Sequence, residues 1–191
     1  MQQLALPPTS VDRAVARTPA HYTNPPIQTV VRVATWSGDN HLLLGLAAAY
    51  WLVSRRGGIR RRVEADHLVL TLAAARVVPK VLKSLVDQER PDRCMVGPDR
   101  RGIETSGNAR DAFPSGHAVN MGAAAAALGW IYPERKPLFW SVALAVASTR
   151  VAILAHWASD VILGGVLGAG LERATRRLAV RRLGGSQRSS P

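Results

Sequence analysis

The sequence predicts an all-α fold, an integral membrane helical bundle with about five transmembrane helices and a loop or cap over a candidate active site. Five apolar runs rich in Ala, Leu, Val and Gly have a helical composition, and they cover about residues 41–53, 67–82, 118–132, 138–155 and 157–171. Several runs are shorter than the roughly 20 residues of a full span, so the placement of charge must supply further support.

Basic residues and tryptophans supply that support. Clusters of arginine and lysine follow the first, third and fifth runs: Arg55, Arg56, Arg60, Arg61 and Arg62, then Arg135 and Lys136, then Arg173, Arg176, Arg177, Arg181 and Arg182. If these clusters are cytoplasmic, the runs alternate consistently and their other ends face the non-cytoplasmic side of the cell (inner) membrane. Tryptophans lie at or near run ends, where interfacial rings belong, although core positions would also explain them: Trp36, Trp51, Trp130, Trp140 and Trp157.

The regions outside the runs divide the chain into three parts. Residues 1–40 contain several prolines and no early apolar core, which predicts a loose N-terminal arm without a secretory signal peptide. Residues 29–36 could form an interfacial segment of this arm. Residues 41–171 form the helical domain, and residues 172–191 are expected to be a basic, mobile tail. The link 84–113 mixes charged residues with glycines, which is typical of a loop or partly helical cap.

Composition excludes one class of partner. A net charge of +12 and a pI near 11.4 would suit nucleic acid, but the arginines concentrate beside apolar runs, where anionic lipid headgroups explain them. The basic residues are not interleaved with aromatic ones as in single-strand binders, so no nucleic-acid partner is expected. Cys94 is the only cysteine, which rules out an intrachain disulfide.

The boundary between the last two apolar runs carries the most informative residues, Arg150, His156 and Asp160. If this segment is helical, His156 and Asp160 lie on one face, and the carboxylate can hold one imidazole nitrogen and leave the other as a free lone pair. Such a histidine is a candidate nucleophile or base, and a fixed guanidinium is what a phosphate would need. A His–Asp pair at this spacing is as often structural, so partners elsewhere must decide.

Two upstream motifs supply such partners. Ser115 precedes an apolar run as a natural N-cap, so the first-turn amides favour an anion, with Gly116 and His117 at the same place. Lys83 is followed by Arg90 and a stiffening proline, which bring two cations within reach of one site. A plain helix cap and an exposed basic surface explain each motif alone equally well, but the ordered set is hard to assemble by chance.

Together the three motifs resemble the signature of the type 2 phosphatidic acid phosphatase superfamily, over about residues 65–171. The matching pieces are Lys83 with Arg90-Pro91, then Pro114-Ser115-Gly116-His117, then Arg150 with His156 and Asp160. The third motif of that family usually reads Ser-Arg, whereas this chain has Thr149-Arg150, a mild change that keeps the hydroxyl. Many membrane members of the family are described with six spans, against about five expected here.

The resemblance implies a role for each position. His156 resembles the nucleophile that takes the phosphoryl group as a phosphohistidine, Asp160 the residue that orients it, and His117 the general acid for the leaving oxygen. The implied phosphate clamp comprises Lys83, Arg90, Ser115, Gly116 and Arg150. The scheme requires no metal or other cofactor, and the remaining histidines are scattered without a metal-ligand spacing. Residues 41–171 would then form a membrane phosphatase domain.

Two further cations, Arg76 and Lys80, lie inside the second apolar run, where charge in contact with lipid is costly. Arg76 is one heptad before Lys83 and faces roughly the same way, which suggests a polar groove that leads to the site. We hypothesise that Arg76 helps to hold an anionic lipid headgroup. Snorkelling of its side chain, or pairing with an acidic neighbour, explains its position equally well.

The leading hypothesis is a metal-independent membrane phosphatase that removes phosphate from a lipid phosphate or diphosphate. Two alternatives stay open. One is a soluble-type acid phosphatase or vanadate-binding haloperoxidase-like protein of the same superfamily, which the short apolar runs favour. The other is a non-enzymatic membrane protein with a degenerate site, against which the complete set of motif residues argues. The lipid cleaved and the oligomeric state do not follow from motif spacing.

Overall fold

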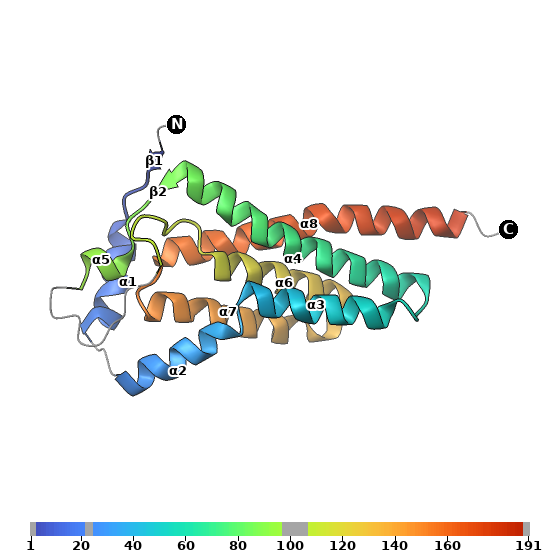
Figure 1. The fold of residues 1–191 in the computed structure, drawn as a ribbon, viewed down its shortest axis with the longest axis horizontal. Helices are drawn as coiled ribbons and strands as arrows, with labels where there is room; N and C mark the ends of the chain where they lie inside the picture. Colours follow the sequence, from blue (N-terminus) through green and yellow to red (C-terminus); the bar gives the residue numbers. More distant parts are fainter. Residues whose placement is uncertain (1–2, 22–24, 97–106, 189–191) are drawn as a thin grey trace.

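The computed structural model describes residues 3–21, 25–96 and 107–188, which form a helical bundle (Figure 1). The five predicted runs become α3 (Asn40–Ser54), α4 (Ile59–Leu85), α6 (Gly116–Ile131), α7 (Lys136–Ala152) and α8 (Ala158–Arg188). The smaller elements are β1 (Leu4–Ala5), α1 (Ser10–His21), α2 (Pro25–Trp36), β2 (Val86–Asp87), α5 (Pro91–Cys94) and the 3-10 helix η1 (Pro133–Arg135). The helical class is therefore confirmed, and each predicted run corresponds to one helix of the bundle.

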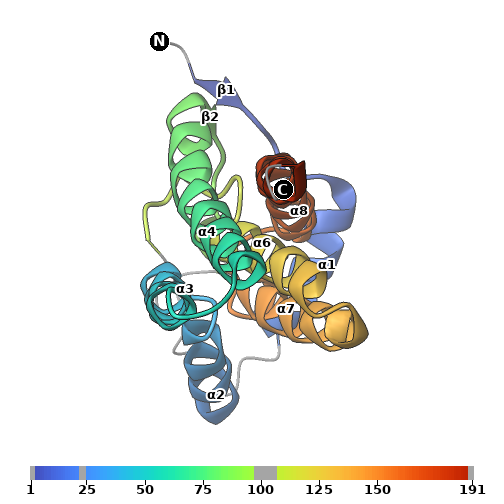
Figure 2. The same cartoon turned by 90° about the vertical axis from the view of Figure 1, so that its right-hand side faces the viewer.

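Helix α6 is the central element, and it packs against α4, α7 and α8 (Figure 2). Its sequence contains no Asp, Glu, Lys or Arg, and most of its residues are buried, which suits a helix surrounded by others. Val119 and Ala123 pack on Ala75 of α4, whereas Met121 packs on Val146 of α7. The core of the bundle is thus built mainly from small side chains on α6.

Glycines bring α6 and α8 into direct backbone contact. A Cβ atom at Gly168 would lie 2.1 Å from the carbonyl oxygen of Val119, and one at Gly122 would lie 2.3 Å from that of Gly165. Neither separation is sterically allowed, so both positions require glycine. Gly164 serves the same close packing, because a Cβ atom there would also crowd α6.

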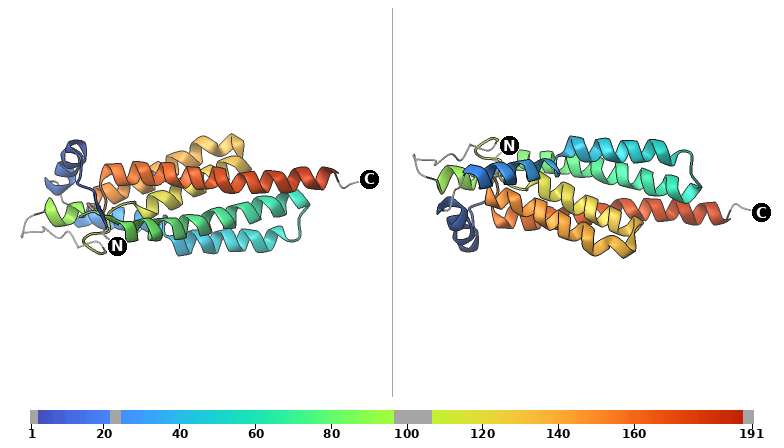
Figure 3. Two further views of the ribbon diagram at one scale, coloured as in Figure 1. Left: turned by 90° about the horizontal axis from the view of Figure 1, so that it is seen from above. Right: turned by 90° about the horizontal axis from the view of Figure 1, so that it is seen from below.

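The two ends of the bundle differ in chemistry. The small elements β1, β2, α1 and α5 gather at one end, and the C-terminus lies at the other (Figures 1 and 3). The predicted motifs lie at the first end, and the arginine clusters at the second, where Arg55 and Arg182 both approach Asp66, at 2.6 and 3.5 Å. The motifs and the basic clusters therefore lie at opposite ends of the bundle.

The sequence predicts that residues 1–40 form a loose arm. In the structure, the described part of this segment packs against the rest of the bundle. β1 pairs in parallel with β2, with Leu4 opposite Val86, and α1 packs against α7 and α8. Residues 29–36 fall within α2, which packs against α7 and exposes 78% of Trp36. The partners of this segment lie far along the chain, where local sequence patterns do not reveal them.

Residues 172–188, which the sequence predicts to belong to a basic, mobile tail, continue α8 as a helix through Arg188. Its extension packs on α4, where Nε2 of His67 lies 3.2 Å from Oε1 of Glu172 and the hydroxyls of Thr71 and Thr175 lie 2.7 Å apart. These buried polar partners on the long α4 stabilise a segment that composition alone marks as solvated.

Two membrane-related predictions are not confirmed. None of the helices in residues 3–21, 25–96 and 107–188 combines the length and the apolar character of a membrane span. The prediction of about five transmembrane helices is not confirmed in that respect. Trp157, expected at an interface, is 1% exposed, and its indole Nε1 donates to the carbonyl oxygen of Glu89 at 2.8 Å, so it is a core residue.

Candidate active site

The link between α7 and α8 is a tight turn, and His156 lies in it, outside both helices. The carbonyl oxygen of Arg150 accepts hydrogen bonds from the amides of Ala155 at 3.0 Å and His156 at 3.2 Å. Leu154 has φ of 55°, in the left-handed region that leucine rarely adopts. Its side chain is 1% exposed and packs in a core cluster with Trp157, so burial offsets the strain of this turn.

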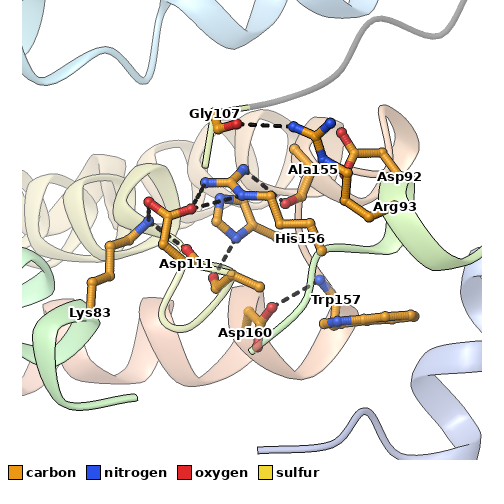
Figure 4. Close-up of polar contacts among 11 residues, drawn as sticks. Lys83, Asp92, Arg93, Gly107, Asp111, Ala155, His156, Trp157 and Asp160 are labelled. Carbon is orange, nitrogen blue, oxygen red and sulfur yellow. Dashed lines mark hydrogen bonds and ion pairs between the residues drawn. The ribbon is translucent and has the colours of Figure 1, made fainter. Parts of the chain in front are cut away.

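A backbone carbonyl fixes the ring of His156. The Nδ1 atom lies 2.6 Å from the carbonyl oxygen of Ala112, which can only accept, so Nδ1 carries the proton of the neutral imidazole. Nε2 then has the lone pair. The side chain is 3% exposed, so the ring is held in one orientation (Figure 4).

Asp160 does not orient His156, contrary to the sequence prediction. Its Oδ2 accepts the backbone N–H of Trp157 at 3.0 Å and caps the first turn of α8 (Figure 4). Its Oδ1 is buried without a hydrogen-bond partner among the described residues. The prediction assumed a helix across both residues, but α8 begins only at Ala158, so the i, i+4 geometry does not form.

Three cations converge on His156, as the motif spacing predicts. Burial, followed by the charges of Arg90, Arg150 and Lys83, lowers the pKa of His156 well below its ordinary value, although the hydrogen bond to Ala112 opposes this shift. The imidazole is therefore neutral at neutral pH, with Nε2 as a free base beside positive charge. This combination suits a nucleophile for an anionic substrate.

The remaining predicted residues lie at the same end of the bundle. Ser115 caps α6, and its Oγ accepts from the amide of Ala118 at 3.5 Å. Gly116 and His117 begin α6 and line a cavity together with Lys83. The Nε atom of Arg150 is a buried donor without a hydrogen-bond partner in the described part of the chain. Buried donors and cations that converge without an internal partner indicate an anion site.

The set of donors suits a phosphate better than a metal ion. No three His, Cys, Asp or Glu side chains in the described ranges are placed to hold a metal ion together. The charges closest to His156 are those of two arginines and one lysine, which repel a cation and attract a phosphate oxygen. The site can therefore bind and polarise a phosphoryl group with its own side chains.

Asp111 is a site residue that sequence reasoning missed. Its Oδ1 accepts from Nε and Nη2 of Arg90, at 2.9 and 2.7 Å, and its Oδ2 lies 3.5 Å from Nζ of Lys83 (Figure 4). Nζ of Lys83 also donates to the main-chain carbonyl of Asp111 at 2.8 Å. One loop residue thus positions both cations of the first motif. No local pattern distinguishes this aspartate from others in the loop.

Asp12 is the second missed residue, and it supports the turn that carries His156. Its Oδ1 accepts the backbone N–H of Ser159 at 2.9 Å, and its Oδ2 accepts the hydroxyl of Ser159 at 2.9 Å. Burial alone would raise the pKa of Asp12, but these bonds and those from Thr9 lower it, so the carboxylate stays ionised at the N-terminus of α8. The capping-box spacing of Thr9 and Asp12 was a readable signal for the start of α1.

With this geometry established, comparison with known proteins identifies the family. The family model described as PAP2 superfamily matches residues 65–183, more than half of the chain, and includes every motif residue named above. The chain belongs to the PAP2 superfamily.

Relatives and solved structures extend this result. Lipid A 1-phosphatase of Rhizobium johnstonii is 32% identical over 104 residues, 54% of this chain and 43% of that protein. Lipid A 1-phosphatase of Rhizobium etli is 32% identical over 99 residues, 51% of this chain and 43% of that protein. The matches span less than half the length of these relatives.

Two crystal structures share the fold. LpxE of Aquifex aeolicus superposes with a TM-score of 0.71 at 16% sequence identity, covering 88% of this chain and 96% of LpxE. The first transmembrane PAP2 type phosphatidylglycerolphosphate phosphatase from Bacillus subtilis superposes with a TM-score of 0.69 at 22% identity, covering 90% and 86%. At these identities the similarity establishes the architecture and not the substrate.

Proposed function

We propose that this protein is a metal-independent lipid phosphatase that acts at a membrane and transfers the phosphoryl group through His156. One observation carries the proposal. A buried imidazole has its Nδ1 fixed by a backbone carbonyl and its Nε2 available, with two guanidinium groups and an ammonium group close by. A nucleophile pre-oriented beside positive charge is the arrangement that phosphoryl transfer requires, because positioning and charge neutralisation supply most of the rate.

In the first step, Nε2 of His156 attacks phosphorus. The N–P bond forms while the bond from phosphorus to the lipid oxygen breaks, and His117 donates a proton to the departing oxygen. Burial and the charge of Arg150 lower the pKa of His117 to about 4 in the free protein, so this role requires the bound phosphate anion to raise that pKa and protonate the ring. Lys83, Arg90 and Arg150 neutralise the charge on the equatorial oxygens. Ser115 and Gly116, at the N-terminus of α6, add further donors to the clamp. The product of this step is a phosphohistidine and a free lipid alcohol.

In the second step, water attacks the phosphohistidine. The new O–P bond forms while the N–P bond breaks, and His117, which has lost its proton, accepts one from the water. This returns His156 and His117 to their starting protonation states and releases inorganic phosphate. Asp160 contributes indirectly in this scheme, because it caps α8 directly after the catalytic turn.

A lipid substrate and a membrane location have independent support. The relatives named lipid A 1-phosphatase and the structural neighbour named phosphatidylglycerolphosphate phosphatase both point to phosphorylated lipids. Large apolar side chains are exposed along α3, α4, α7 and α8, including Leu46, Val77, Leu144, Ile162 and Val166, each at least 56% exposed. Acyl chains would cover such a surface, which water would not favour.

A trapping experiment tests the catalytic assignment. Brief reaction of the purified protein with a lipid labelled in its phosphate should leave acid-labile, base-stable label on His156. The His156→Ala variant should carry no label and should not turn over. For His117→Ala, label should accumulate slowly while substrate binding is largely retained. Label on Ser115 would contradict the assignment, and full activity in chelator is required for metal independence.

The only cysteine of the chain offers a topology test. Cys94 is exposed on α5, at the same end as the site, whereas Gly57 lies at the basic end of the bundle. A membrane-impermeant maleimide should label Cys94 in cells whose outer barrier has been opened and whose inner membrane is intact. A Cys94→Ser/Gly57→Cys variant should be labelled only after lysis. The reverse pattern would place the site on the cytoplasmic face.

A further inference from the structure

A cavity of about 290 Å³ continues from the candidate active site along α4. It shares Lys83, Gly116 and His117 with that site, and then extends between α4, the start of α6 and the start of α3. Its further lining includes Arg76 and Lys80, which the proposed reaction does not use. The cavity is therefore contiguous with the catalytic centre but reaches beyond the phosphoryl group that is transferred.

The charge in this extension is positive and largely uncompensated. The guanidinium of Arg76 lies 3.5 Å from Nδ1 of His41, and neither Arg76 nor Lys80 forms an ion pair with a described residue. The one carboxylate in the lining, Asp39, accepts the amides of His41 and Leu42 as the N-cap of α3. Of the explanations for Arg76 left open by the sequence, pairing with an acidic neighbour is therefore not observed.

Two amide side chains give independent evidence for a polar ligand. Asn120 is 5% exposed, lines the cavity and has a buried Oδ1 without a hydrogen-bond partner among the described residues. Asn40 lines the same cavity, and both its Nδ2 and its Oδ1 are buried and unpartnered. Buried amides are normally satisfied, and two of them beside two cations indicate a ligand that carries both oxygen acceptors and hydroxyl or water donors.

We propose that this cavity is a second phosphate subsite, so that the substrate headgroup carries a further phosphate besides the one removed. The inference rests on the proposed lipid phosphatase function and narrows its substrate class. Arg76 and Lys80 bind the retained phosphate, and Asn40 and Asn120 bind its hydroxyl or a bridging water. The second phosphate can be joined to the first as a diphosphate or carried at a separate position of a bisphosphorylated headgroup.

The test compares three lipids of matched chain length, a monophosphate, a diphosphate and a lipid with two separate headgroup phosphates. In Arg76→Gln/Lys80→Gln, kcat/KM for at least one two-phosphate lipid should fall by about tenfold to a hundredfold, the effect of one or two charge-assisted hydrogen bonds. The monophosphate should change less than about twofold. Lys136→Gln, which removes a charge at the opposite end, should change none of the three. Which two-phosphate lipid responds identifies the source of the second phosphate.

Two outcomes overturn the subsite, namely an equal loss for all three lipids and no loss for any. A binding measurement separates this failure from failure of the proposed function. By calorimetry, methylenebisphosphonate should bind the wild-type protein more tightly than inorganic phosphate, and the double variant should lose that preference. Bisphosphonate preference without lipid turnover would keep the subsite and reject the phosphatase. Turnover without that preference, together with no selective loss for either two-phosphate lipid in the double variant, would reject the subsite and keep the phosphatase.

Discussion

Asp111 offers a sharp test of the proposed phosphate clamp, because it contacts both cations of the first motif. Replacement by Asn keeps the shape of the side chain and one oxygen acceptor for Arg90, but removes the negative charge. A phosphate held by Arg90 and Lys83 would lie about 5–6 Å from this carboxylate, and with an effective dielectric constant of about 20–40 the two repel by roughly 1.5–3 kcal/mol. The side chain is 26% exposed, so we take the lower figure.

We therefore expect Asp111→Asn to bind inorganic phosphate about tenfold more tightly than the wild type, since about 1.4 kcal/mol corresponds to a factor of ten. The inhibition constant of phosphate in the lipid assay, or calorimetry of the purified protein, measures this change. Asp111→Ala should instead lower kcat by about tenfold or more, because Arg90 loses the acceptor that holds its Nε and Nη2.

Asp87→Asn is the matched control, because Asp87 lies on the neighbouring β2 and pairs with the exposed Arg110. That variant should leave phosphate affinity unchanged. Phosphate binding by Asp111→Asn that is equal to or weaker than wild type would refute the reasoning. It would show that Asp111 positions the clamp without competing with the substrate anion.

Three further predictions concern helix packing, the N-terminal segment and pH. In a thermal unfolding assay, Gly168→Ala should lower the free energy of unfolding by about 1–3 kcal/mol, because the added Cβ would overlap the carbonyl of Val119. The control Gly170→Ala adds a Cβ into open space and should be neutral or slightly stabilising in the same assay. Asp12→Ala removes the cap of the helix that follows His156, so it should lower the free energy of unfolding by about 0.5–2 kcal/mol. It should also reduce kcat more than it raises KM. An unchanged kcat would refute the positioning role. Burial and the nearby cations lower the pKa of His156, so its ring should stay neutral, in the nucleophilic form, as the pH falls through 6.5. NMR titration of this ring should therefore show no ionisation near the ordinary histidine pKa.

Local sequence patterns predicted much of the fold and many residues of the candidate site. The apolar runs predicted the five main helices because helix formation follows composition and periodicity within a single segment. The three motifs identified Lys83, Arg90, His117, Arg150 and His156, and the structure brings these residues to one end of the bundle. The N-cap role of Ser115 was also predicted correctly, because capping depends on only four consecutive positions.

The sequence by itself thus determined the helical class and the identity of most of the residues that meet at the site. Only the tertiary structure decided how those residues are held. The partner of His156 is a carbonyl 44 residues away, not Asp160, and the cap from Asp12 to Ser159 joins positions 147 residues apart. The physical reason is that a backbone carbonyl or a loop carboxylate has no sequence signature of its own, and its role depends on which distant segment packs against it.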